Sequence, residues 1–114
     1  MKLYSLGVVT LTGTAINLST LLTGATEFLA ADIRAAKICI QPLVGNSAVS
    51  YVGLVGFNKS TGVGVLRQLN VQPSTGKMDI GCLCSQDLNN ALYIRDFAVD
   101  GTSGDKVLVT YAIS

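Results

Sequence analysis

The sequence predicts an all-β fold, an antiparallel β-sandwich or a small β-barrel of about seven or eight strands. β-branched residues, glycine and threonine are plentiful, and no segment sustains the apolar period of three to four residues that marks a helix. Turn signals recur about every eight to twelve residues, which is the spacing of a sandwich or barrel. A length of 114 residues suits one such domain.

The first strands are expected in a threonine-rich opening segment. Residues 3–12 predict a strand that is apolar on both faces, and residues 14–22 predict a second strand in which apolar and polar side chains alternate. Up to position 26 the only charged side chain is Lys2. We therefore distinguish residues 1–26, which form either part of the core or an extended assembly arm, from a β-sandwich domain at residues 27–114.

The segment 26–37 is the one place where a short helix competes with a loop. Thr26 can cap a helix and Glu27 would lie in its first turn. The apolar spacing behind them is loose, so we expect a loop with at most one or two helical turns.

The rest of the chain alternates strand patterns with clusters of turn residues. Glycine, proline, asparagine, aspartate and serine gather between apolar runs, where they favour turns. Strands are expected at residues 36–42, 49–57, 63–71, 78–84, 91–95 and 106–113, with connections at residues 45–47, 58–62, 72–76 and 87–90. The alternation is clear from residue 36 onward, and the final strand also alternates along its length.

Composition limits the classes of partner. Hydrophobic residues make up 49% of the chain and charged residues 13%, with a net charge of +1. No apolar run reaches the roughly 18 residues of a membrane-spanning helix, and no basic stripe suits nucleic acid. The apolar start resembles a signal peptide, but Ser5, Gly7 and Thr10 interrupt it, and we expect no secretion signal. Neither a membrane nor a nucleic acid is an expected partner.

Catalytic machinery is not expected either. The chain has no histidine, which excludes a serine or cysteine nucleophile activated by an imidazole. Asp96, Asp100 and Asp105 surround a glycine-rich turn, yet their spacing does not match the ligand pattern of an EF-hand. We interpret them as turn residues and predict a protein that is not an enzyme, with no cofactor and no metal.

The three cysteines allow several states. Cys82 and Cys84 are two residues apart, which places both thiols on one face of a strand, and Cys39 is a candidate cross-strand partner of either. A zinc site would lack its fourth ligand. Free thiols, buried or half-buried, are the favoured interpretation and fit a reducing cytoplasm; one cross-strand bridge comes second, and a metal site comes last.

Four segments resemble small virion proteins of tailed bacteriophages. These are ICIQP at residues 38–42, YVG at residues 51–53, LNNALYI at residues 88–94 and GDKVLVTY at residues 104–111. Their order is similar to that in capsid-decoration (cement) and head-fibre proteins. Pro42 stands where that family pattern has an aspartate, and residues 97–100 are a further departure from it.

The resemblance implies a non-enzymatic virion structural protein. Such a protein is made in the bacterial host cytoplasm, binds the major capsid protein on the outside of a phage head, stabilises the shell, and is a homo-oligomer, most often a trimer. The alternatives are a tail or fibre component and a carbohydrate-binding β-sandwich module.

Contacts with the partner are expected in the opening segment and in the loops at residues 58–62 and 72–77. The uncharged opening segment suits addition to a neighbour's sheet edge. The candidate contact residues are Lys2, Tyr4, Thr10, Thr12, Asn58, Lys59, Pro73 and Lys77.

Overall fold

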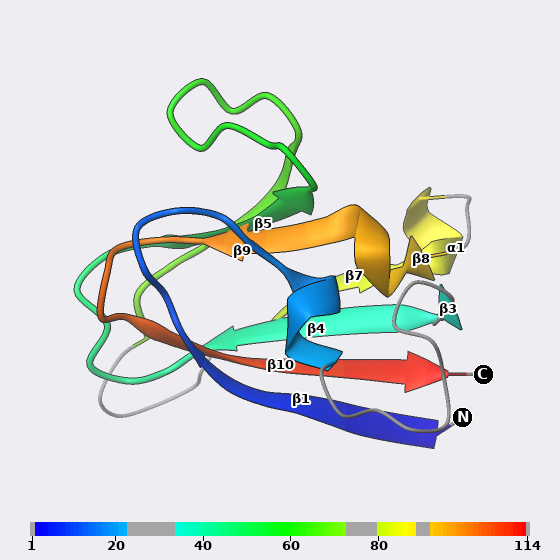
Figure 1. Cartoon of the computed structure of the whole chain (residues 1–114). Coiled ribbons are helices and arrows are strands. Elements are labelled where there is room, and N and C mark those ends of the chain that lie inside the picture. The colour runs from blue at the N-terminus through cyan, green and yellow to red at the C-terminus, as the bar shows by residue number, and fades with distance from the viewer. Residues whose placement is uncertain (1, 23–33, 73–79, 89–91, 114) are drawn as a thin grey trace.

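The computed structural model describes residues 2–22, 34–72, 80–88 and 92–113. It confirms the predicted all-β class: two antiparallel four-stranded sheets pack face to face (Figure 1). The described residues contain ten strands, and three of these have only two residues.

The first sheet, which we call sheet A, has the strand order β1-β10-β4-β7. Its strands are β1 (Lys2–Thr10), β10 (Lys106–Ile113), β4 (Lys37–Pro42) and β7 (Gly81–Cys84). Each neighbouring pair is antiparallel. The chain's first and last strands therefore lie side by side, and β1 forms one edge (Figure 1).

The second sheet, sheet B, has the order β2-β9-β5-β6. Its strands are β2 (Ile16–Asn17), β9 (Phe97–Asp100), β5 (Ser50–Leu54) and β6 (Val65–Leu69). A separate pair joins β3 (Arg34–Ala35) to β8 (Leu92–Tyr93). The short helices are η1 (Leu18–Leu22), α1 (Ser85–Leu88) and η3 (Ile94–Asp96).

The hydrophobic core lies between the two sheets. Alternate residues of each long strand point inward, because successive side chains of a strand face opposite sides. The fully buried side chains include Ile38, Ile40, Val52, Val99, Val107 and Val109. At one end of sheet A, Tyr4 and Tyr111 are directly opposed and their rings stack at 5.2 Å between centroids. Burial raises the pKa of Tyr111 above its usual range, with a smaller contribution from Tyr4.

The opening segment contributes to this core. Val9 and Leu11 are buried at the end of β1, and Leu18 is fully buried in η1. The predicted strand at residues 14–22 is wrong beyond Asn17, where the chain turns into η1. Leu18 and Leu21 both pack on the core, and their three-residue spacing places them on one side of a 3-10 helix.

Two other predicted strands differ from the structure, and one strand of the structure was not predicted. The strand expected at 49–57 ends at Leu54, and the one expected at 91–95 is only β8 followed by η3. The strand β9 was not predicted: all four of its residues are buried, so its sequence does not alternate. The competing helix or loop at 26–37 lies mostly outside the described residues, as do residues 73–79.

Candidate interaction surface

The outer face of sheet B, which points away from sheet A, is partly covered by the connection between β5 and β6. This segment, residues 55–64, lies on that side of the sandwich (Figure 1). Phe57 is buried and lies over Gly53, where an added Cβ would come within 3.1 Å of the ring and would also collide with the carbonyl of Gly64. Gly64 has a φ of 80°, a conformation that favours glycine. The close packing of this loop therefore requires glycine at both positions.

Lys59 fastens the same loop to the sandwich. Its Nζ donates to Asp100 Oδ1 at 3.0 Å, to the Gly13 carbonyl at 2.9 Å and to the Gly101 carbonyl at 3.3 Å. Asp100 is buried, and its Oδ1 also accepts the Gly101 N–H at 2.7 Å. The ammonium thus joins three connections at one end of the fold.

Asp105 performs a similar task in the turn before β10. Its carboxylate accepts hydrogen bonds from the Ser47 N–H at 2.9 Å, from the Ser47 hydroxyl at 3.1 and 3.2 Å, and from the Ala48 N–H at 3.2 Å. The hydrogen bond from the Ser47 N–H is the main cause that lowers the pKa of Asp105. Burial raises this pKa, and the bonds from the Ala48 N–H and the Ser47 hydroxyl lower it further. The neighbouring Asn46 side chain donates to the Lys106 carbonyl and accepts its N–H, both at 2.8 Å. As interpreted from the sequence, both aspartates hold turns.

The outer face of sheet A is different, because none of the described residues covers it. Its apolar side chains come from all four strands or their ends, and Leu3, Val8 and Ile80 are 72%, 57% and 54% exposed. Leu3 and Ile80 line a depression of about 460 Å³ on this face. The depression is lined by Leu3, Lys37, Cys39, Gln41, Ile80, Cys82, Leu108, Thr110 and Ala112. We call the side chains of this depression, together with Val8 and Lys106, the sheet A surface.

A disulfide between Cys39 and Cys82 forms part of the floor of this depression. The favoured reading of free thiols is wrong for these two residues and holds for Cys84. Cys39 and Cys82 are directly opposed in the register of β4 and β7, with Cα atoms 4.1 Å apart. Direct opposition brings the two thiols together, whereas Cys84 is opposite Lys37.

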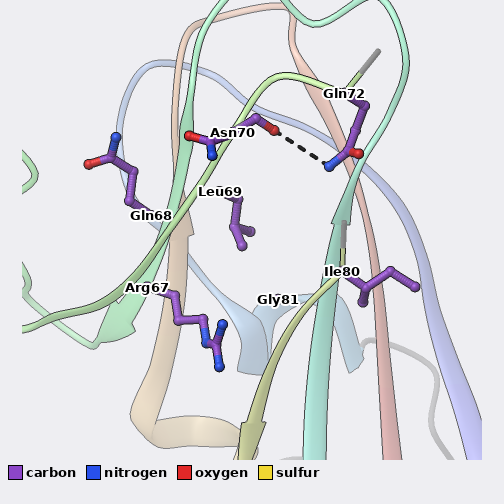
Figure 2. A pocket seen from close by; sticks show the side chains of 7 residues that line it. All are labelled: Arg67, Gln68, Leu69, Asn70, Gln72, Ile80 and Gly81. Atoms are coloured by element: carbon purple, nitrogen blue, oxygen red, sulfur yellow. Dashed lines mark hydrogen bonds between the residues drawn. The ribbon is translucent and has the colours of Figure 1, made fainter. Parts of the chain in front are cut away.

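A second depression, of about 270 Å³, lies where the edges of the two sheets meet at β6 and β7. Figure 2 shows its lining: Arg67, Gln68, Leu69, Asn70, Gln72, Ile80 and Gly81. The Gln72 amide donates to the Asn70 carbonyl at 3.5 Å. The Leu69 side chain lies so close to Gly81 that a Cβ added to Gly81 would overlap it. This depression is a polar seam between the sheets.

A third depression of about 270 Å³ lies beside the Lys59 contacts. It is lined by Ala48, Val49, Tyr51, Lys59, Ser60, Gly101 and Thr102. Tyr51 is its aromatic side chain, and it is half-buried.

The structure distributes the eight sequence-predicted contact residues over different parts of the fold. Tyr4 is half-buried against Tyr111, and Thr10 and Thr12 are exposed. Asn58 Oδ1 accepts the N–H groups of Ser60 and Thr61 and so holds its own turn. The side chain of Lys2, and the whole of Pro73 and Lys77, lie outside the described residues.

Lys59 and the loop after Thr12 do come together, through the Gly13 carbonyl. The sheet A surface was missed as a site. Its signal was present in the sequence, because residues 3–12 are apolar on both faces and Leu108 and Ala112 add apolar groups to the outer side of the last strand.

Among the described residues, no three histidine, cysteine, aspartate or glutamate side chains are grouped so that they could hold a metal ion. In the same part of the chain, no helix has the length and apolar character needed to cross a membrane.

The chain matches no family model, no curated protein and no solved structure.

Proposed function

We propose that this chain is a non-enzymatic structural protein that binds another protein through the sheet A surface, and that its partner is the major capsid protein of a phage head. In this role it decorates and stabilises the outside of the shell, and it assembles with copies of itself. The identity of the partner rests on the resemblance of residues 38–111 to phage decoration proteins. The docking surface rests on the structure.

The observation that carries the proposal is the contrast between the two sheets. The chain covers part of the outer face of sheet B with its own loop, anchored by Phe57 and Lys59, but the described residues leave the corresponding face of sheet A open. Exposed apolar patches rimmed by polar residues are typical of protein interaction sites. Burying the remaining exposed parts of Leu3, Val8 and Ile80 would contribute about 3–5 kcal/mol before the costs of association.

Two further features support a structural role. The sequence has no histidine, so general acid–base chemistry near neutral pH would need other groups. The Cys39–Cys82 disulfide suits a protein that works outside a reducing compartment, and virion surfaces are one place where disulfides persist. Synthesis in the host cytoplasm would then precede formation of the bond.

Co-sedimentation with shells assembled from the cognate major capsid protein tests the proposal. The native chain is expected to saturate shells at a fixed stoichiometry, and Leu3→Glu should weaken docking at least tenfold because it places a charge in the interface. Val63→Glu is the matched control, since Val63 is 71% exposed but lies on the β5–β6 connection. A native chain that stays in the supernatant would refute capsid binding.

Immuno-electron microscopy of intact particles separates the head from the tail. Label on the head supports decoration, and label confined to the tail would favour the alternative of a tail or fibre component. A carbohydrate-binding module would instead use the depression beside Tyr51, and Tyr51→Ala would then abolish glycan binding without changing shell docking.

A further inference from the structure

The two ends of the sheet A surface carry positive charge. Lys37 is exposed and pairs with Ala112, while Lys106 is exposed at the start of β10, opposite Thr10. The six residue steps from position 106 to position 112, at about 3.4 Å each, place the two lysines about 20 Å apart along the face. Within the described part of the chain, neither ammonium has an ion-pair partner.

The described carboxylates lie elsewhere. Asp100 is paired with Lys59, Asp105 faces Ser47 and Ala48, and Asp96 lies on η3 beside Arg95. Among the described residues, the sheet A surface therefore has a mainly apolar middle and a positive charge at each end. A partner segment that covers it needs apolar side chains in its middle and negative charge at both ends.

The shape of the surface limits the form of that segment. Leu3 on β1 and Ile80 before β7 lie at opposite edges of the sheet, and the lining between them includes the disulfide, Leu108 and the smaller side chains of Thr110 and Ala112. The three strand spacings from β1 to β7 add up to about 14 Å. An α-helix with its side chains is about 10–12 Å wide, so one helix fits along β10 and β4.

Addition of an extended strand to the β1 edge is a poorer fit. The register of β1 against β10 shifts between Ser5 and Gly7, and the Gly7 N–H bonds to the Ser5 hydroxyl. Such a bulge interrupts the row of backbone groups that a new strand would need.

We propose that the sheet A surface binds an amphipathic helix of the capsid protein that carries carboxylates about 14 residues apart. That spacing follows from 20 Å at 1.5 Å per residue, and it corresponds to about four helical turns. This inference rests on the proposed function and specifies the interface. Lys37 and Lys106 pair with the terminal carboxylates, and the apolar stripe of the helix fills the depression between Leu3 and Ile80.

Fluorescence anisotropy with overlapping 18-residue peptides that tile the major capsid protein tests the inference directly. A peptide with an apolar stripe and acidic ends is expected to bind, and its version with lysines at those ends should bind at least tenfold more weakly. The double variant Lys37→Glu/Lys106→Glu should lose binding at least tenfold and prefer the lysine version. The control Arg67→Glu/Arg95→Glu removes the same charge from exposed residues outside the surface and should change affinity less than twofold.

The outcomes separate this inference from the proposed function. Docking of the native chain on shells, with no tiled peptide bound or with acidic and lysine versions bound equally, would overturn the helix and leave capsid binding intact. Light scattering that shows a dimer, which Leu3→Glu converts to a monomer, would assign the surface to a second copy and overturn the inference. Peptide binding without shell docking would support the surface and refute decoration.

Discussion

Replacing Asp105 by asparagine tests how the turn before β10 is held. The carboxylate accepts bonds from two backbone N–H groups and one hydroxyl, on Ser47 and Ala48. An asparagine keeps one oxygen but directs an NH₂ group at a neighbouring donor. Losing a bond to a charged acceptor costs about 1.5–3 kcal/mol, and because Ser47 is exposed and Ala48 half-buried, water satisfies the donor that is left and no further penalty is added. We expect Asp105→Asn to lower the free energy of unfolding by about 2–3 kcal/mol at pH 7.

The effect should depend on pH with a defined sign. The pKa of Asp105 is lower in the folded chain than its usual value near 3.8, so the folded state favours the ionised form. Its contribution to stability is complete above that usual value and is lost as the pH falls through the lower, folded-state pKa. Urea unfolding at pH 7 and again at about pH 2 should therefore show the native chain and Asp105→Asn converging in acid.

Asp96→Asn provides the control for this experiment. Asp96 is about half exposed and makes only a long contact of 3.9 Å with Arg95, so its replacement should change stability by less than about 0.5 kcal/mol. The reasoning fails if Asp105→Asn is as stable as the native chain at pH 7, or if the two differ equally at both pH values.

Three other changes probe the features that shape the two outer faces. Lys59→Met should lower the free energy of unfolding, measured by chemical denaturation, by about 1–2 kcal/mol. This is less than the roughly 3–5 kcal/mol for breaking a fully buried ion pair, because the Lys59 side chain is 32% exposed. Gly53→Ala should cost at least about 2 kcal/mol, because its Cβ meets the Gly64 carbonyl, and should increase hydrogen exchange in residues 55–64. Removing the disulfide with Cys39→Ala/Cys82→Ala should lower the free energy of unfolding by about 4 kcal/mol, because the bridge closes a loop with a sequence separation of 43. Alkylation followed by mass spectrometry should find one free thiol in the native chain.

Each of these has a result that would contradict it. Lys106→Met is the control for Lys59→Met. An equal loss of stability in both variants would show that the hydrogen bonds of Lys59 to Asp100, Gly13 and Gly101 contribute nothing specific. Unchanged exchange in Gly53→Ala would mean that the β5–β6 loop is not packed on β5. Cys84→Ala should leave stability nearly unchanged, and three alkylated thiols in the native chain would contradict the bridge.

Strands with one buried face could be predicted from the sequence. Residues 106–113 alternate apolar and other side chains, and β10 has the predicted bounds. The strand β9 could not be found in this way, because all four of its residues are buried and its outward-facing Asp100 is paired with Lys59. The segment after Asn17 was mistaken for a strand because Ile16 and Leu18 alternate with Asn17 and Ser19, as in a strand with one buried face.

The site depended on tertiary information to a greater degree. The pairing of Cys39 with Cys82 follows from the register of β4 against β7, which sequence spacing does not fix. Lys59 looked like a free loop lysine until the structure placed Asp100 and two carbonyls around it. The sheet A surface draws on strands from both ends of the chain and its middle, so its separate apolar residues form a patch only in the folded protein.

Radical footprinting of the chain on and off cognate capsid shells tests the central claim most directly. If the sheet A surface docks, oxidation of Leu3 and Leu108 should fall at least tenfold in the bound state, while Val63 on the β5–β6 connection should react as in the free chain. Protection of Val63 with unchanged oxidation of Leu3 and Leu108 would contradict the account.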